Sequence, residues 1–232
     1  WIKVVRLMAL LAMSVWCVIF WYWLINSLGT TTIKIFMGSS TGDLLSATDD
    51  EVLAVLSNGK RVVAAHAEDE MMMIENKKNI LGDSTDVAMH HIWRSKESCL
   101  SATTRLVTLA RKAGRRVHVL HITSAEEMEY LAQNKDIASV EVLPNHLTLH
   151  APDCYNELGT LAQQNPPIRE KEHQDALWKG ILSGNLQTTA TDHACFCNDQ
   201  KAAGKDDFRI TPNGTAGIEN RMEVLWHHGV NT

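Results

Sequence analysis

The 232-residue sequence has few cysteines and no pattern that would pair them. Its five cysteines are an odd number and contain no Cys-x-x-Cys pair. A disulfide framework in a small secreted protein normally uses an even, regularly spaced set, and Cys-x-x-Cys is typical of redox and zinc motifs. These absences argue against a disulfide-stabilised secreted protein. They favour a reducing compartment, and we expect a cytoplasmic location.

The sequence also lacks any concentration of positive charge. Its formal net charge is -5, and acidic and basic residues alternate along the chain. Proteins that bind nucleic acids present a basic patch to the phosphate backbone, so nucleic acid is not an expected partner. The chain shows no internal repeat and no low-complexity linker, and it is long enough for one large domain with its own core.

A third absence concerns the N-terminus, where no charged residue lies between Arg6 and Lys34. Residues 7–28 are apolar and aromatic, and about twenty such residues next to basic ones are enough for a membrane span. Two interpretations of the segment 1–32 stay open: a membrane anchor, or a buried or subunit-covered strand and helix of the domain. We favour the second. No small-residue cleavage site follows, so no signal peptide is predicted.

From residue 33 onward, short apolar strands alternate with helices. Capping residues and glycine stops predict helices at 49–58, 98–112, 125–133 and 171–182. Apolar runs predict strands at 33–37, 61–65, 116–120, 137–142 and 187–191. Helices between short buried strands indicate parallel βαβ units. The predicted fold class is therefore α/β, with residues 33–232 forming part of a TIM-type barrel.

Four of these strands carry or precede a residue that could bind a metal ion. They are Lys34, His66, His121 and Asp192. The C-terminal ends of barrel strands meet at one rim, so these side chains should converge. A lysine ammonium repels cations, but a neutral lysine can add carbon dioxide and become an anionic carbamate with two oxygens. Lys, His, His and Asp on successive strands therefore suggest a two-metal hydrolase.

The strings around these residues resemble the cyclic amidohydrolases of the amidohydrolase superfamily: dihydroorotases, hydantoinases and dihydropyrimidinases. The resemblance covers roughly residues 33–232. Residues 34–42 and 141–169 are similar to dihydroorotases. From His173 onward the chain is similar to hydantoinases and dihydropyrimidinases, above all at residues 192–197 and 212–214.

The resemblance implies a role for each candidate. Lys34 would bridge two divalent ions, zinc by family pattern, as its carbamate, and His66, His121 and Asp192 would complete the ligands. Asp192 would also be the catalytic residue that accepts and returns a proton. The family's metals share a hydroxide that attacks the ring carbonyl.

Substrate binding and assembly are also implied by the resemblance. The substrate would be a small cyclic amide, held by Asn165 and Asn213. Pro212-Asn213-Gly214 is also an ordinary turn signal, and both interpretations of Asn213 stay open. The family further implies a homo-oligomer, either a dimer or a tetramer.

The sequence departs from the family in three places. It has no His-x-His string, which the family's first strand supplies to the more buried metal. We therefore expect an incomplete barrel that lacks the first strands and the small β-sandwich domain, or an incomplete metal site. Ser39 stands where hydantoinases have a tyrosine, and residues 192–196 depart from the dihydroorotase string.

The function predicted on these grounds is hydrolysis of a cyclic amide, with dihydroorotase slightly favoured. A hydantoinase or dihydropyrimidinase is the first alternative. The second is a non-catalytic scaffold homologue with an incomplete metal site. Four ligands in place argue against the scaffold, which has no need of Lys34 or Asp192.

The remaining histidines and cysteines are expected to be outside the site. His118 lies three residues before His121, a spacing that puts the two on opposite faces of a strand, so we interpret His118 as structural. The pairs at 90–91 and 227–228 are expected to be exposed and not to bind metal. Cys195 and Cys197 are interpreted as small apolar residues of the barrel rim.

Overall fold

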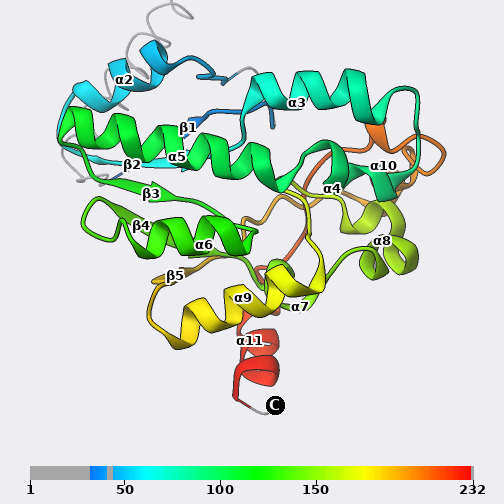
Figure 1. Cartoon of the computed structure of the whole chain (residues 1–232). Helices are drawn as coiled ribbons and strands as arrows, with labels where there is room; N and C mark the ends of the chain where they lie inside the picture. Colours follow the sequence, from blue (N-terminus) through cyan, green and yellow to red (C-terminus); the bar gives the residue numbers. More distant parts are fainter. Residues whose placement is uncertain (1–31, 41–43, 231–232) are drawn as a thin grey trace, which may run out of the picture. The chain divides into compact units, whose positions relative to one another are not determined.

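The computed structural model describes residues 32–40 and 44–230 (Figure 1). The chain divides into two compact units, Trp1–Ile33 and Lys34–Thr232. The predictions made for the apolar stretch 7–28 fall outside the described residues. In the part of the chain that the structure describes, no helix is both long and apolar enough to cross a membrane.

One sheet of five strands runs in the order of the chain. The strands are β1 (Thr32–Phe36), β2 (Val62–His66), β3 (Val117–Val119), β4 (Ala138–Val142) and β5 (Thr188–Thr189). The pairings of β2 with β3, β3 with β4, and β4 with β5 are all parallel. The predicted α/β class with a parallel sheet is therefore confirmed. Parallel strands that pair in chain order need a crossover between each pair, and helices supply it here.

The crossovers follow the predicted alternation. The longer helices are α2 (Asp49–Ser57), α3 (Glu70–Asn76), α5 (Lys96–Ala113), α6 (Ala125–Ala132), α9 (Lys171–Leu182) and α11 (Arg221–Val230). Shorter ones are α4 (His90–Trp93), α7 (Pro144–Thr148), α8 (Asp153–Leu158) and α10 (Asn198–Ala202). A π-helical turn (Lys77–Leu81) and 3₁₀ turns at Val87–Met89, Gly159–Ala162 and Phe208–Ile210 complete the described elements.

The helix ends are set by capping residues and by a glycine, the signals used to predict the helices from the sequence. Thr48 and Glu51 form a reciprocal capping box at the start of α2. Ser124 caps α6 by accepting a hydrogen bond from the Glu127 amide. Gly114 ends α5 in the left-handed conformation, at φ 63°, which glycine adopts without steric cost. Helix α9 has the predicted bounds, whereas β5 is shorter than predicted.

The two faces of the sheet differ in polarity. The side chains of Val63, Val117 and Val140 belong to the main apolar core, together with residues of α5, α6 and α9. These three helices lie along one side of the sheet (Figure 1). The opposite face carries His66 and His118, because side chains alternate along a strand. The sheet therefore has an apolar face toward the helices and a polar face on which a site can form.

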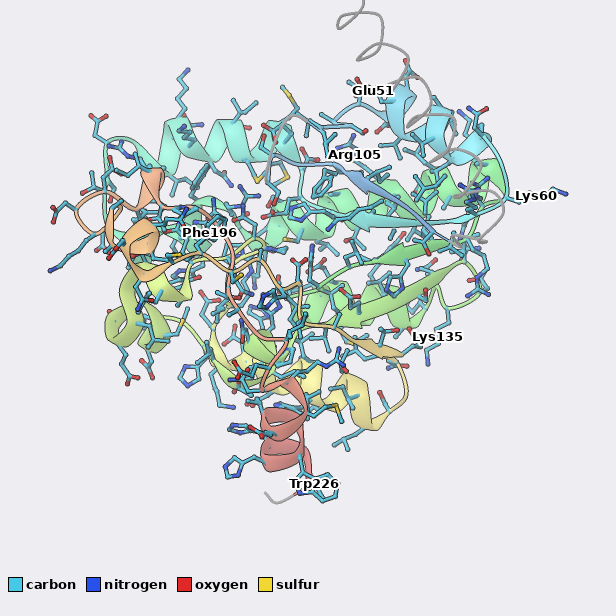
Figure 2. All side chains as sticks on the ribbon, turned by 180° about the vertical axis from the view of Figure 1, so that it is seen from behind. Glu51, Lys60, Arg105, Lys135, Phe196 and Trp226 are labelled. Carbon is cyan, nitrogen blue, oxygen red and sulfur yellow. The ribbon has the colours of Figure 1, made fainter. Side chains whose placement is uncertain are left out.

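Helix α11 contacts this core through the half-buried Leu225. None of its residues is buried, and Trp226 is 61% exposed at the end of the described chain (Figure 2). The pair His227 and His228 lies on this helix and is exposed, as expected.

Candidate metal and substrate site

Five of the six predicted site residues line one cavity of about 210 Å³. They are Lys34, His66, Asn165, Asp192 and Asn213. The sixth, His121, is fully buried beside His66. The loop residues Gln164 and Thr215 also line this cavity. The strand ends thus bring together side chains that lie up to 179 residues apart, which is the separation of Lys34 and Asn213 (213 − 34).

His66 lines this cavity, and the ring of His121 lies directly behind it. His66 Nδ1 lies 3.1 Å from His121 Nε2, and each residue is 1% exposed. The rings are nearly perpendicular, with centroids 4.8 Å apart. Two imidazole nitrogens at this separation can share one proton or face one common ion, since neutral imidazole nitrogen is a metal ligand.

The orientation of His66 is fixed from behind by Glu68. His66 Nε2 lies 2.7 Å from Glu68 Oε2, which leaves Nδ1 as the nitrogen directed at His121. Glu68 is itself fully buried and is held by Arg94, whose Nε donates to Oε1 at 3.1 Å. Burial alone would raise the pKa of Glu68, but the Arg94 charge and the His66 contact outweigh it and hold the pKa well below its usual range. Glu68 is thus a permanent carboxylate.

The sequence analysis did not assign a role to Glu68 or Arg94. A carboxylate two residues after a strand-end histidine lies on the same side of an extended chain, and the His66-x-Glu68 spacing carries that signal. Carboxylates that hold the second nitrogen of a metal-binding histidine are a recurring feature of metal sites. Arg94 lies 26 residues further on, and no local spacing in the sequence links it to Glu68.

Burial keeps His121 neutral. Desolvation, followed by the neighbouring His66 and His146 imidazoles, lowers the pKa of His121 well below its ordinary value. Its Nδ1 has no hydrogen-bond partner within the described residues. The residue has a φ of 37°, a conformation that non-glycine residues adopt rarely and usually at functional sites.

This backbone turn corrects the argument made for His118. Strand β3 ends at Val119, so the positive φ of His121 interrupts the alternation of side chains and turns its ring toward His66. His118 pairs in register with Ala64, two residues before His66, and therefore faces the same side. It still has a structural partner, because its Nδ1 lies 2.8 Å from Ser139 Oγ.

Asp192 completes the group from the last strand. Its Oδ2 lies 4.0 Å from His121 Nε2, and its side chain is 39% exposed toward the cavity opening. Like His121, it has a positive φ, here 44°. The carboxylate is close enough to interact with the imidazole through the cavity. It is also accessible enough to exchange protons with a bound molecule.

Lys34 lines the cavity but is exposed, so it is not an inward-facing residue of a buried strand. The reason is its strand: β1 is the edge strand of the described sheet. The Lys34 ammonium lies 4.7 Å from the centre of the Phe36 ring, and that ring lies 5.7 Å from the ring of His66. Lys34 therefore reaches the site along the Phe36 side of the cavity.

The two predicted asparagines differ in which of their amide groups lack a hydrogen-bond partner. Asn165 is 7% exposed, and neither its amide nitrogen nor its oxygen has a hydrogen-bond partner within the described residues. Buried unpaired polar atoms are costly, so such an amide is suited to a polar ligand in the cavity. Asn213 Oδ1 accepts from Gln163 Nε2 at 2.9 Å, which leaves its amide nitrogen available.

The donor set fits a metal ion in part. Among the described residues, no group of three or more His, Cys, Asp and Glu side chains is arranged to hold one. Two imidazole nitrogens are in place, and the Asp192 carboxylate lies 4.0 Å from the His121 nitrogen. Lys34 becomes a ligand only as its carbamate, which would add the oxygens that the set lacks.

Two pairs of residues that were expected to lie outside the site differ from the prediction in their burial. His90 and His91 were expected to be exposed but are buried, because α4 packs against the segment at Gln164, whose carbonyl lies 3.0 Å from His90 Nε2. Cys195 and Cys197 are exposed free thiols and not apolar rim residues.

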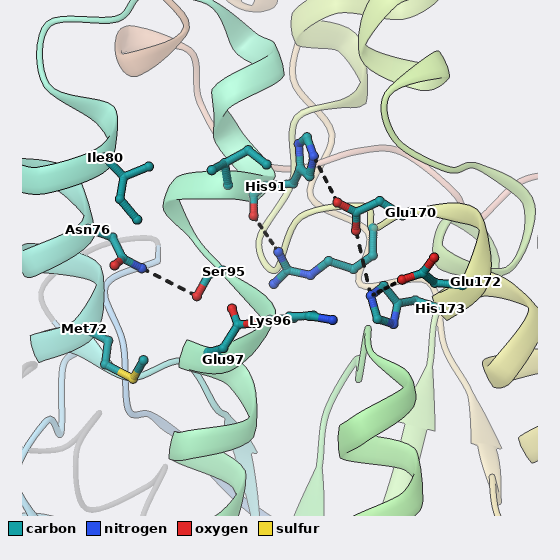
Figure 3. Close-up of a pocket in the computed structure, with 12 residues that line it drawn as sticks. Met72, Asn76, Ile80, His91, Ser95, Lys96, Glu97, Glu170, Glu172 and His173 are labelled. Atoms are coloured by element: carbon teal, nitrogen blue, oxygen red, sulfur yellow. Dashed lines mark hydrogen bonds and ion pairs between the residues drawn. The ribbon is translucent and has the colours of Figure 1, made fainter.

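A second and larger cavity contains none of the predicted residues. It measures about 450 Å³ and lies among α3, α4 and the start of α9 (Figure 3). Glu170 joins two histidines at its wall, 3.4 Å from His91 Nε2 and 3.8 Å from His173 Nε2. Burial lowers the pKa of both histidines, which are held at the cavity wall by their contacts with Glu170.

Known proteins of similar sequence are named as hydantoinases and dihydropyrimidinases. A D-hydantoinase of Geobacillus stearothermophilus is 32% identical over 212 residues, which are 87% of this chain and 45% of that protein. A dihydropyrimidinase of Dictyostelium discoideum is 29% identical over 228 residues, 90% of this chain and 43% of that protein. No protein-family model matches the chain.

The fold is similar to a solved structure of the same kind. The crystal structure of dihydropyrimidinase from Brevibacillus agri NCHU1002 superimposes with a TM-score of 0.82 at 30% identity, over 90% of this chain and 47% of that one. The chain therefore spans less than half the length of the relatives that it matches.

Proposed function

The chain belongs to the cyclic amidohydrolases of the hydantoinase and dihydropyrimidinase group, and we propose that its site hydrolyses a C–N bond in a small cyclic amide with the help of metal ions. One observation carries the proposal: His66 Nδ1 and His121 Nε2 converge to 3.1 Å at the wall of a cavity that His66, Asp192 and Lys34 line. The names of the relatives favour hydantoin or dihydropyrimidine substrates over dihydroorotate.

We further propose that the site takes two divalent ions, zinc by family pattern. His66 and His121 would bind through the two nitrogens that face each other, and Asp192 and the carbamate of Lys34 would supply oxygens. Bound there, the metals would lower the pKa of a shared water and polarise the scissile carbonyl. Support comes from the neutrality of His121 and from Glu68, which fixes the nitrogen that His66 presents.

The chain's own residues would carry the remaining steps. Asp192 would accept the proton of the attacking water at Oδ2 and return it to the leaving amide nitrogen. Its partial exposure supports this, because a proton shuttle must reach both groups. Asn165 and Asn213 would hold the amide edge of the ring, with unpaired donors and acceptors on Asn165 and a free amide nitrogen on Asn213.

The surrounding architecture is proposed on the same basis. Strands β1 to β5 would be consecutive strands of a TIM-type barrel, which has eight in its complete form. A homo-oligomer, either dimer or tetramer, and a cytoplasmic location also remain proposals, and sedimentation velocity would test the first.

The proposal is tested by hydrolysis and metal analysis together. The zinc-loaded chain is assayed against hydantoin, dihydrouracil and dihydroorotate, beside the variants Asp192→Asn and Asp206→Asn. We expect ring opening of at least one substrate, a loss of about 100-fold or more for Asp192→Asn, and no loss for the exposed control Asp206→Asn. A chain that binds two zinc ions and opens none of the rings would contradict catalysis and favour the scaffold alternative.

A further inference from the structure

A buried lysine lies behind the substrate side of the cavity. Lys201, on the short helix α10, is 3% exposed, although lysine is almost never fully buried unless it is paired. It does not line the cavity that holds Lys34 and His66. It lines a separate cavity of about 290 Å³ together with Gly214 and Thr215, so its role toward the first cavity must be indirect.

The ammonium group of Lys201 donates to two backbone carbonyls from separate loops. Nζ lies 2.7 Å from the Gln163 oxygen and 2.8 Å from the Pro212 oxygen. The ring of Phe196 lies on a third side, with its centroid 5.8 Å away. Burial lowers the pKa of Lys201 to about 8, so the group is mostly protonated at neutral pH. Hydrogen bonds from a charged donor are roughly twice as strong as neutral ones.

Each of these two loops carries one substrate-site asparagine. Gln163 precedes Asn165 by two residues, and Pro212 immediately precedes Asn213. The loops also bond to each other directly. The Gly214 amide donates to the Gln163 oxygen at 3.1 Å, and Gln163 Nε2 donates to Asn213 Oδ1 at 2.9 Å.

Two glycines in this region lie in close contact with neighbouring atoms. At Gly214, where φ is 151°, a Cβ atom would lie 2.6 Å from the Ala194 carbonyl oxygen, and at Gly204 it would lie 1.6 Å from Thr211 Oγ1. The turn at residues 212–214 is therefore seated directly on the segment that follows Asp192.

We propose that Lys201 is a positioning residue that sets the spacing of Asn165 and Asn213 across the cavity. By bonding both carbonyls, it holds the two loops together, so that the amide groups face one ring from two sides. This role rests on the proposed hydrolysis of cyclic amides. It concerns the binding of the substrate's amide edge and not the proton transfer at Asp192.

Steady-state kinetics of Lys201→Met distinguish positioning from a merely structural role. Methionine keeps most of the length and apolar volume but donates no hydrogen bond. Loss of two charge-assisted bonds should raise KM for a cyclic amide about 10-fold or more, with kcat within about threefold of wild type. Lys205→Met is the matched control, because Lys205 is exposed four residues away on the same segment.

The outcomes separate this inference from the proposed function. A wild-type chain that opens no ring overturns the proposed function and this inference with it. Wild-type activity with an unchanged KM in a folded Lys201→Met variant, judged by far-UV circular dichroism, overturns the inference alone. If Lys201→Met does not fold, Lys201→Gln is compared instead, since its shorter amide reaches at most one of the two carbonyls. If neither variant folds, Lys201 is structural and the proposal fails.

Discussion

His66 Nδ1 and His121 Nε2 lie 3.1 Å apart although 55 residues separate the two histidines in the chain. The first is placed by the end of β2 and the second by a backbone turn just after β3. The Asp192 carboxylate approaches this pair, with Oδ2 at 4.0 Å from His121 Nε2. Two buried imidazoles whose nitrogens face each other can bind one metal ion between them.

Removal of the carboxylate behind His66 should weaken metal binding without touching a proposed ligand. In Glu68→Gln, His66 Nε2 loses its charged partner, so the ring is free to turn Nδ1 away from His121. We expect zinc affinity, measured by titration against a competing chelator, to fall about 10- to 100-fold. Glu129→Gln, at an exposed position, should leave the affinity unchanged.

The same variant should be less stable, because Arg94 then keeps a buried charge with no anionic partner. Breaking a buried ion pair from one side typically costs about 3–5 kcal/mol of unfolding free energy. Urea unfolding of the metal-free variant measures this cost. Full stability combined with full zinc affinity in Glu68→Gln would show that the Glu68 contacts carry neither function.

Lys34 should act through its carbamate. Lys34→Ala should lose bound metal and activity together, and short carboxylic acids such as acetate should restore part of both by occupying the vacated space. Lys34→Arg keeps the positive charge but cannot form the carbamate, so it should be as inactive as alanine. If Lys34→Arg bound two metals and opened cyclic amides normally, Lys34 would be an ordinary residue of β1.

Stability should fall in acid because of a buried histidine outside the site. Burial, and then the Arg94 charge, lower the pKa of His90 to about 3, against an ordinary value of 6.5. Below pH 6.5 the unfolded chain therefore binds a proton that the folded chain does not, so unfolding becomes easier as the pH falls toward 3. The expected contribution is about 1.4 kcal/mol per pH unit within this window.

Urea unfolding at several pH values between 7 and 4 measures this slope. His90→Gln, which keeps a side-chain donor, should flatten the slope by about one proton, and His227→Gln on the exposed face of α11 should leave it unchanged. An identical slope in wild type and His90→Gln would mean that His90 is protonated in the folded protein.

The fold was largely predictable because its signals are local. Capping at Thr48, the glycine stop at Gly114 and the bounds of α9 depend on residues a few positions apart. The gathering of the strand-end residues was also predictable, since parallel strands end at one edge.

The details of the site depend on contacts that local sequence does not encode. The exposure of Lys34 follows from the edge position of β1, and the burial of His90 follows from packing against Gln164, 74 residues away. The prediction that His118 and His121 lie on opposite faces of a strand was wrong because the backbone turns at His121. A positive φ at a histidine has no sequence signature. Arg94 and Lys201 bind partners far along the chain for the same reason.

The most direct test of the account is the position of bound metal. Crystals of the chain grown with zinc and bicarbonate would be measured at the zinc absorption edge, and the anomalous difference map would be calculated. The account predicts zinc peaks in the cavity, one of them about 2.0–2.2 Å from both His66 Nδ1 and His121 Nε2, with Asp192 and a carboxylated Lys34 as further ligands. Zinc bound only elsewhere on the chain, with the two imidazoles still 3.1 Å apart, would contradict it.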